Sequence, residues 1–452
     1  MTHERHDRPT VKNLAARLLT GDWKRGSGQS FTAQTLSLIA GRGLGKLMNF
    51  AGFLLLARAL GPAAYGGFTF AFSLASILVF LPNMGVDGLF SRQVARGHEP
   101  AREILGTMLV MKAAGSLIYI PLFLGIIYLS PTTPAARDGA AAVAVALVLL
   151  SFWVTWSTVL ITASRAHVAG VLEVIAAAVF LSLCATWVYQ RPSVVAASMA
   201  FLAGQVVLFA VGGIVSLGPV GRLKVPVDRR TYLRVLGGAA PFLLIWFANN
   251  LYYKIDATLL YYFRGDAETG LYSAAYRLLE GLLAVAIVVG STALPRLTRA
   301  WTRSANDFKV EWRRGFRLLC WVTVVPSLAL VAAPGVFIEV LFGSSFVDAA
   351  SSLRLLGVGG ALLCLGTYFG FSLTATGLEW AQLRITAIAL AVNVVLNLVC
   401  IPIAGGQGAA LATVLAGAVY LALANRTLRS AHTRTANSLP PRDSVVAPVC
   451  QE

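Results

Sequence analysis

Six positively charged side chains lie inside stretches of sequence that are otherwise apolar. A charged residue at the centre of a membrane span costs about 2.5–3.5 kcal/mol to insert, so it usually faces a partner or a polar cavity rather than lipid. Lysine and arginine also hold phosphate groups through charge-assisted hydrogen bonds. These cations therefore predict an anion-binding site among membrane helices. The six are Arg42, Lys46, Lys112, Lys254, Arg277 and Arg354, and all except Arg354 are candidate residues of this site.

In the N-terminal part of the chain, three of these cations form the predicted site. Arg42 and Lys46 are four residues apart and share one face of a helix. With Lys112, they are expected to bind an anionic head group such as a diphosphate. The alternative is structural, with Arg42 pairing with Asp87 or Glu173 to hold the helices together.

In the C-terminal part, cations alternate with carboxylates. Lys254 and Asp256 end one apolar stretch, and Arg277 and Glu280 lie in the next. Two opposite-charge pairs in neighbouring helices are expected to form one network, which is either a gate or a structural salt-bridge cluster. Lys254 and Arg277 are further candidate substrate-binding cations. The candidate carboxylates for ion coupling or gating are Asp256 and Glu280, together with Glu173 from the N-terminal part.

Amide and aromatic side chains add weaker candidates. Asn249 and Asn250 carry amides that can bind sugar hydroxyls, as do Asn393 and Asn397. Ordinary interhelical amide bonds are the alternative. A group of tyrosines is expected to form an interface belt, with stacking on sugars as the alternative. They are Tyr252, Tyr253, Tyr261, Tyr262 and Tyr272.

The composition requires that membrane helices position these residues. The 452-residue chain is 57% hydrophobic and 13% charged, whereas soluble domains carry about 25% charged residues. Its mean hydropathy is +0.72, and its apolar runs approach the roughly 20 residues that cross a bilayer. A soluble enzyme, a disulfide scaffold and a disordered chain are excluded.

The apolar runs predict an all-α polytopic protein with about twelve transmembrane helices in two six-helix lobes. The expected domains are a tail (1–30), an N-lobe (31–216), a basic linker (217–234), a C-lobe (235–425) and a second tail (426–452). The expected spans are 32–58, 66–90, 105–129, 139–163, 167–189, 193–216, 235–262, 269–294, 316–341, 352–376, 381–403 and 407–425.

The distribution of cations predicts the orientation. If the N-terminus is cytoplasmic, 27 of the 37 lysines and arginines fall in inner segments, four in outer segments and six in the spans. Positive charge favours cytoplasmic loops, so both termini are expected to be cytoplasmic and the protein to lie in the inner, or plasma, membrane. The net charge of +17 therefore reflects topology rather than nucleic-acid binding.

An internal repeat supports two equivalent lobes. Residues 61–74 align without a gap on residues 265–278, which places Gly61 on Gly265 and Gly66 on Gly270. Both copies join the first two helices of a lobe. Two lobes in the same orientation imply parallel repeats, with a cationic substrate path between them.

No cofactor or metal is expected. The sequence contains no P-loop, zinc motif or catalytic triad, which predicts that the protein is not an enzyme. The glycines of the segment 41–45 follow no strand, and Gly41 with Gly45 fits a close helix contact better than a nucleotide loop. Energy must come from an ion gradient, the membrane potential or substrate flux.

Short motifs along residues 31–425 carry a family resemblance. The chain resembles the oligosaccharide flippases of the polysaccharide-transporter group, within the multidrug/oligosaccharidyl-lipid/polysaccharide exporter superfamily. The terminal tails are not covered. The motifs are Leu60-Gly-Pro-Ala-Ala-Tyr-Gly66, Lys254-Ile-Asp256, Gly270-Leu-Tyr-Ser-Ala-Ala-Tyr-Arg-Leu-Leu-Glu280, Phe342-Gly-Ser-Ser-Phe346, Asn393-Val-Val-Leu-Asn397, Ile401-Pro402 and Gly406-Gln-Gly-Ala-Ala-Leu-Ala-Thr413.

This resemblance implies a flippase that works by alternating access. It would move a polyprenyl-(pyro)phosphate-linked oligosaccharide from the cytoplasmic to the external leaflet, for a cell-surface polysaccharide such as exopolysaccharide or O-antigen. The implied partners are this lipid-linked substrate and membrane lipids. A polysaccharide polymerase and a coupling ion, H⁺ or Na⁺, are further candidates, and nucleic acid is not expected.

Two other functions stay open. An ion-coupled multidrug or small-molecule antiporter of the same superfamily would need a net acidic cavity, whereas these spans are cationic. A membrane glycosyltransferase or polymerase usually needs long external loops with catalytic residues, and here the external loops are short.

Overall fold

A computed structural model describes residues 31–90, 101–163, 165–220 and 229–438. The predicted tail 1–30, the arginines of segment 91–100, most of the basic linker (221–228) and the chain end 439–452 lie outside these residues. The predicted C-terminal tail lies in part inside them, since the last helix continues to Ser438.

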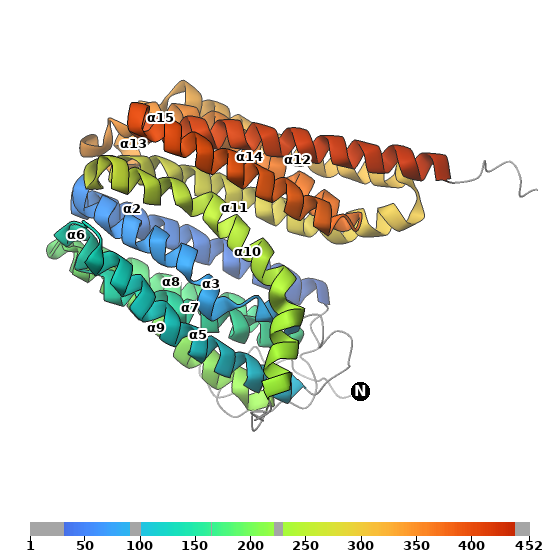
Figure 1. Ribbon diagram of the computed structural model, residues 1–452, viewed down its shortest axis with the longest axis horizontal. Helices are drawn as coiled ribbons and strands as arrows, with labels where there is room; N and C mark the ends of the chain where they lie inside the picture. Colours follow the sequence, from blue (N-terminus) through green and yellow to red (C-terminus); the bar gives the residue numbers. More distant parts are fainter. Residues whose placement is uncertain (1–30, 91–100, 164, 221–228, 439–452) are drawn as a thin grey trace, which may run out of the picture. The chain divides into compact units, whose positions relative to one another are not determined.

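The described parts of the chain are helical almost throughout (Figure 1). The first half contains α2 (Phe31–Leu78), α3 (Phe80–Asn83), α5 (Ala101–Leu129), α6 (Pro134–Arg137), α7 (Ala140–Thr162), α8 (Ala166–Leu183), a π-helical segment (Cys184–Val188) and α9 (Val194–Val220). The second half contains α10 (Arg229–Arg264), α11 (Asp266–Arg303), α12 (Ala305–Ala332), α13 (Pro334–Phe342), a 3₁₀ turn (Ser344–Phe346), α14 (Ala349–Ala375) and α15 (Glu379–Ser438).

Most of these helices are long and apolar enough to cross a membrane. Among the described residues nine qualify outright, and the two parts of α10, Arg230–Ala240 and Phe242–Arg264, make a tenth when they are counted as one span. The predicted all-α, multi-pass membrane protein is confirmed at this level. The expected loop between residues 294 and 316 is helical instead, because Ser304 ends α11 and its hydroxyl caps α12 by accepting from the Asp307 N–H at 3.0 Å.

Glycines break the two longest helices. Gly61 interrupts α2 with φ 72° and ψ 172°, and Gly405 interrupts α15 with φ 53° and ψ −129°. Gly265, between α10 and α11, has φ 82° and ψ −169°. Gly61 and Gly265, which the sequence repeat aligns, therefore share a backbone conformation that is essentially restricted to glycine.

By its contacts the chain divides into a first unit, Met1–Asn250, and a second unit, Leu251–Glu452. In the first unit α2 packs on α8, and α7, α8 and α9 pack on one another. A Cβ atom on Gly41 would lie 2.8 Å from the Gly170 Cα, and one on Gly45 would lie 3.2 Å from the Glu173 carbonyl oxygen. The interpretation of Gly41 and Gly45 as a close helix contact is confirmed.

The beginning of α10 belongs to this first unit. The rings of Phe80 and Phe247 lie 4.8 Å apart, and a Cβ atom on Gly88 would lie 2.7 Å from the Phe242 ring. The core nearby contains Met108, Trp153 and other buried apolar residues.

In the second unit, α11, α12, α14 and α15 pack together. Small residues again allow neighbouring helices to approach each other closely. A Cβ atom on Gly357 of α14 would lie 2.7 Å from a Val331 methyl group of α12, and Gly290 of α11 leaves room for the Phe371 ring of α14.

We expect the two helix-breaking glycines to differ in their tolerance of alanine. Gly61→Ala adds only backbone strain, about 1–3 kcal/mol, because no atom lies within 4 Å of the new Cβ. Gly405→Ala should destabilise the protein further, because its Cβ would displace the Glu268 carboxylate. Thermal unfolding of the purified protein in detergent measures both effects.

The control is Gly125→Ala, a helical glycine with open space around its Cβ. It should leave the unfolding temperature unchanged or raise it. If Gly405→Ala unfolded no earlier than this control, the break in α15 would not depend on glycine.

Candidate functional site

Arg42 lies between three helices of the first unit. Its Nε donates to Glu173 Oε1 of α8 at 3.1 Å, and its Nη2 donates to Ser157 Oγ of α7 at 3.1 Å. The close approach of α2 and α8 at Gly41 and Gly45 makes this pair possible. Of the two acids named as alternative partners of Arg42, Glu173 is the one that it contacts.

Lys46, one turn further along α2, is exposed. Within the described parts of the chain it forms no hydrogen bond or ion pair. The helix face therefore presents one cation that is paired and one whose donors are not used.

Lys112 is completely buried and its ammonium group is fully occupied. Its Nζ donates to Asp87 Oδ2 at 2.8 Å, to the Ser151 carbonyl oxygen at 2.8 Å and to Asn83 Oδ1 at 3.2 Å. Asp87 Oδ1 accepts a further hydrogen bond from Thr155 Oγ1 at 2.5 Å. An ammonium group has three donors, so Lys112 in this conformation has none left for a ligand.

In the second unit, Lys254 and Arg277 share a single carboxylate. Lys254 Nζ donates to Glu280 Oε1 at 2.7 Å, and Arg277 Nη1 donates to Glu280 Oε2 at 2.6 Å. All three side chains are partly exposed, Glu280 the most at 28%. Two positive charges against one negative charge leave this cluster, the 254–277–280 cluster, with a net charge of +1.

Asp256 lies on α10 only two residues from Lys254, in a different environment. Its carboxylate is buried and accepts hydrogen bonds from three neutral donors: Asn397 Nδ2 at 2.6 Å, Thr413 Oγ1 at 2.7 Å and Tyr272 Oη at 3.0 Å. Asn397 Nδ2 also lies 3.1 Å from Asn393 Oδ1. Among the described residues no cation contacts this carboxylate.

The expectation that Lys254, Asp256, Arg277 and Glu280 form one network is therefore wrong. Residues two apart on a helix point in different directions, and the two side chains contact different residues: Asp256 binds Tyr272 of α11 and residues of α15, whereas Lys254 binds Glu280, about two turns further along α11. The charged residues form a cationic cluster, and Asp256 forms a separate carboxylate site.

The break in α15 at Gly405 shapes the Asp256 site. Asn397 precedes the break and Thr413 follows it, yet both contact the same carboxylate. The break is held by Arg264, whose Nη2 donates to the Pro402 carbonyl oxygen at 2.8 Å, and by Glu268, which accepts from the Gly406 N–H at 2.8 Å. These side chains satisfy backbone groups that a broken helix would leave without partners.

The amides of Asn249 and Asn250 bond within their own helix. Each Nδ2 donates to a carbonyl oxygen one turn earlier, at Ile245 (2.9 Å) and Trp246 (3.0 Å). Both side chains are half-buried.

Sequence reasoning missed three groups around Asp256. Tyr272, expected in an interface belt, is buried and donates to the carboxylate. Thr413 belongs to a sequence motif to which no role was assigned. The contacts of Arg264 and Glu268 with the backbone at the break in α15 were not predicted either. Over the described residues no group of three or more His, Cys, Asp or Glu side chains could hold a metal ion.

The chain matches known families and proteins. Residues 31–301, more than half of the chain, match the family described as "Polysaccharide biosynthesis protein". The probable low-salt glycan biosynthesis flippase Agl15 of Haloferax volcanii is 24% identical over 387 residues, or 83% of this chain and 79% of that protein. The probable flippase AglR of the same organism is 28% identical over 198 residues, 43% of this chain and 40% of that protein.

Solved structures show the same fold. The lipid II flippase MurJ in an inward closed conformation superposes with a TM-score of 0.74 at 12% identity, covering 89% of this chain and 90% of that one. An inward-facing multidrug resistance MATE family transporter of the MOP superfamily gives a TM-score of 0.68 at 16% identity, covering 88% and 96%. These proteins are flippases and transporters rather than enzymes, as predicted for this chain. The chain belongs to the polysaccharide biosynthesis protein family.

Proposed function

We propose that the protein is a flippase that moves a polyprenyl-(pyro)phosphate-linked oligosaccharide from the cytoplasmic to the external leaflet by alternating access. One observation carries the proposal: Lys254 and Arg277, two cations in apolar helices, contact the same carboxylate, Glu280, so that these three side chains carry a net positive charge. A persistent positive charge in a membrane is costly, and an anionic substrate that crosses it is a reason to keep it. Relatives named as flippases support this proposal.

The proposed topology has twelve crossings, with both termini cytoplasmic and lobes at 31–216 and 235–425. The apolar stretch that α2 forms with α3 has 44 residues, Ala40–Asn83, about 66 Å at 1.5 Å per residue, whereas the hydrocarbon core is about 30 Å thick. Two crossings that turn at Gly61 resolve this mismatch, and α15 turns likewise at Gly405. With the bent α10, the nine apolar helices of the described chain then give twelve crossings.

We propose that the cations bind the diphosphate group of the substrate. In the second unit Lys254 and Arg277 are partly exposed, and one carboxylate does not neutralise both. In the first unit Lys46 is exposed and Arg42 is 39% exposed. Lys112 contributes by holding α5 and α7 together, since its three donors are used. Asn249 and Asn250 still offer amide oxygens to sugar hydroxyls.

We assign ion coupling to Asp256 rather than to Glu280 or Glu173. Glu280 and Glu173 are each bound to cations, so a proton or Na⁺ would have to displace a salt bridge. Asp256 has only neutral donors around it, and a buried carboxylate without a cation gains most from taking up a positive ion. Both H⁺ and Na⁺ fit this chemistry.

The alternative is an ion-coupled antiporter for a small cationic compound, since a MATE transporter shares the fold. Asp256 is the one observation that favours it. The net positive 254–277–280 cluster is unfavourable for a cationic cargo, which is why we rank the flippase first. Complementation of a flippase-deficient strain tests the assignment, and efflux of a lipophilic cation without a glycan phenotype on deletion would reverse it.

Removing the proposed head-group cations should abolish glycan export. We expect Lys46→Ala and Arg277→Gln to weaken diphosphate binding by about 10- to 100-fold each, the equivalent of one lost charged hydrogen bond. Surface glycan in the complemented strain gives the readout. Membrane insertion should be unchanged, and Lys46→Arg should retain part of the activity.

Arg354→Ala is the matched control, because Arg354 is an exposed arginine of α14 outside these clusters. It should complement fully. Full complementation by Lys46→Ala and Arg277→Gln as well would refute the assignment of the anion site.

Asp256→Asn should remove the dependence of transport on an ion gradient. The amide has nearly the same shape but cannot take up a positive ion. In membrane vesicles with an imposed Na⁺ or H⁺ gradient, wild-type protein should flip a polyprenyl-diphosphate sugar faster with the gradient of its coupling ion, and the variant should not respond. The control is Glu339→Gln, which changes an exposed carboxylate of α13. If Asp256→Asn still responded to the ion gradient, Asp256 would not be the coupling group.

A further inference from the structure

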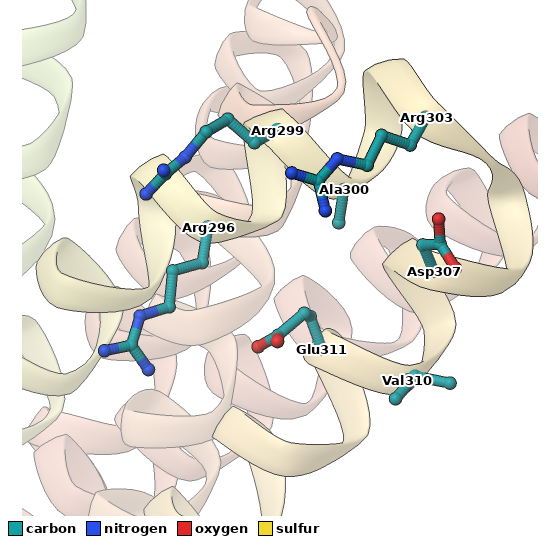
Figure 2. A pocket seen from close by; sticks show the side chains of 7 residues that line it. All are labelled: Arg296, Arg299, Ala300, Arg303, Asp307, Val310 and Glu311. Carbon is teal, nitrogen blue, oxygen red and sulfur yellow. The ribbon is translucent and has the colours of Figure 1, made fainter.

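A pocket at the turn between α11 and α12 has no role in the function proposed above. Its volume is about 370 Å³, within the 300–1,000 Å³ typical of small-molecule pockets. Figure 2 shows the three arginines extending from one helix and the two carboxylates from the helix that follows the turn. The lining residues are Arg296, Arg299, Ala300 and Arg303 of α11 and Asp307, Val310 and Glu311 of α12.

The three arginines of the pocket lie on the same side of one helix. Their spacing of three and four residues places them along one face of α11 (Figure 2). All three are exposed, and none forms an ion pair with Asp307 or Glu311 in the described structure. Arg299 Nε donates to the Pro295 carbonyl oxygen at 3.2 Å, which leaves the other guanidinium donors available.

The charge around the pocket favours an anion despite the two carboxylates. Between residues 296 and 317 the chain carries seven cations against only Asp307 and Glu311. An arginine fork matches the oxygens of a phosphate group. The positive charge and the N–H donors near the pocket therefore exceed what the two carboxylates can neutralise or accept, and an anionic head group can bind the remainder.

Exposed apolar side chains lie at the pocket and further along the same side of α12, with the exposed Arg314 and Arg317 between them. Val310, in the pocket wall, is 60% exposed, and Trp321 is 72% exposed. They lie eleven residues apart, about three turns, and thus on the same side of the helix, separated by about 16 Å. A ligand with a phosphate head and long apolar chains fits this combination, because its chains can follow α12 while its phosphate reaches the arginines.

We propose that this pocket binds the phosphate group of an anionic membrane lipid. Basic pockets between membrane helices are known to take phosphate head groups. The phosphate can come from an ordinary phospholipid or from the lipid-linked substrate, and the experiment separates these sources. The inference does not depend on transport, so it can fail or hold independently of the flippase proposal.

The test is native mass spectrometry of the purified full-length protein titrated with three lipids: phosphatidylglycerol, phosphatidylcholine and a polyprenyl diphosphate. Wild-type protein should bind phosphatidylglycerol better than zwitterionic phosphatidylcholine. Arg299→Gln/Arg303→Gln should weaken that binding at least about tenfold, a loss equivalent to one charged hydrogen bond.

The matched control is Lys309→Gln/Arg313→Gln, which removes the same two charges from exposed positions of α12 that do not line the pocket. It should bind within about twofold of wild type, since a specific site depends on local donors more than on diffuse charge. A second variant, Arg299→Lys, keeps the charge but loses the fork, and an intermediate affinity is expected.

The outcomes separate clearly. Arginine-dependent binding of the polyprenyl diphosphate alone would identify the substrate as the source of the phosphate and uphold the site. If the pocket and control variants lost lipid affinity equally, binding would depend on diffuse charge, and the proposed site would be overturned. Wild-type lipid affinity in the pocket variant would also overturn it. Unfolding temperatures of all variants show whether a loss of binding reflects a loss of fold.

Discussion

A charged side chain in a membrane helix needs an opposite charge or a full set of polar partners, because lipid offers neither. This requirement organises both units of the protein. Lys112 is enclosed by a carboxylate and two other oxygen acceptors, and Arg42 is held by Glu173 and Ser157. Around Glu280, Lys254 and Arg277 contact the same carboxylate.

Backbone geometry sets where those partners can meet. Glycines on facing helices let α2 approach α8 closely enough for Arg42 to reach Glu173. At Gly405 the chain leaves helical geometry, and the segment after the break returns to place Thr413 beside Asp256. The polar sites therefore depend on small residues that contact no ligand themselves.

Much of the fold could be predicted from sequence, because apolar runs near 20 residues have one main explanation. The repeat also identified Gly61 and Gly265, which share a rare conformation. Contacts between distant residues were harder. Glu173 was one of two acids offered as partners for Arg42, 131 residues away, and nothing in the pattern linked Thr413 to Asp256 across 157 residues.

Two expectations from the sequence were wrong for physical reasons. Grouping Lys254 with Asp256 treated neighbours in sequence as neighbours in space, although positions two apart on a helix diverge. Residues 294–316 lie between two predicted spans because they are rich in charge. Charged residues can continue a helix beyond the hydrocarbon core, and here Ser304 alone interrupts it.

The order of the charged partners along the chain has a consequence for biosynthesis. Asp87 is synthesised 25 residues before Lys112, so the lysine meets its acid as soon as α5 is made. Arg42 precedes Glu173 by 131 residues, and its helix must wait in the membrane, or at its surface, until α8 has been translated. During that interval the unpaired arginine costs up to about 2.5–3.5 kcal/mol if it sits at the bilayer centre. The pairing of the charged residue on α2 therefore depends on a segment that the ribosome makes much later.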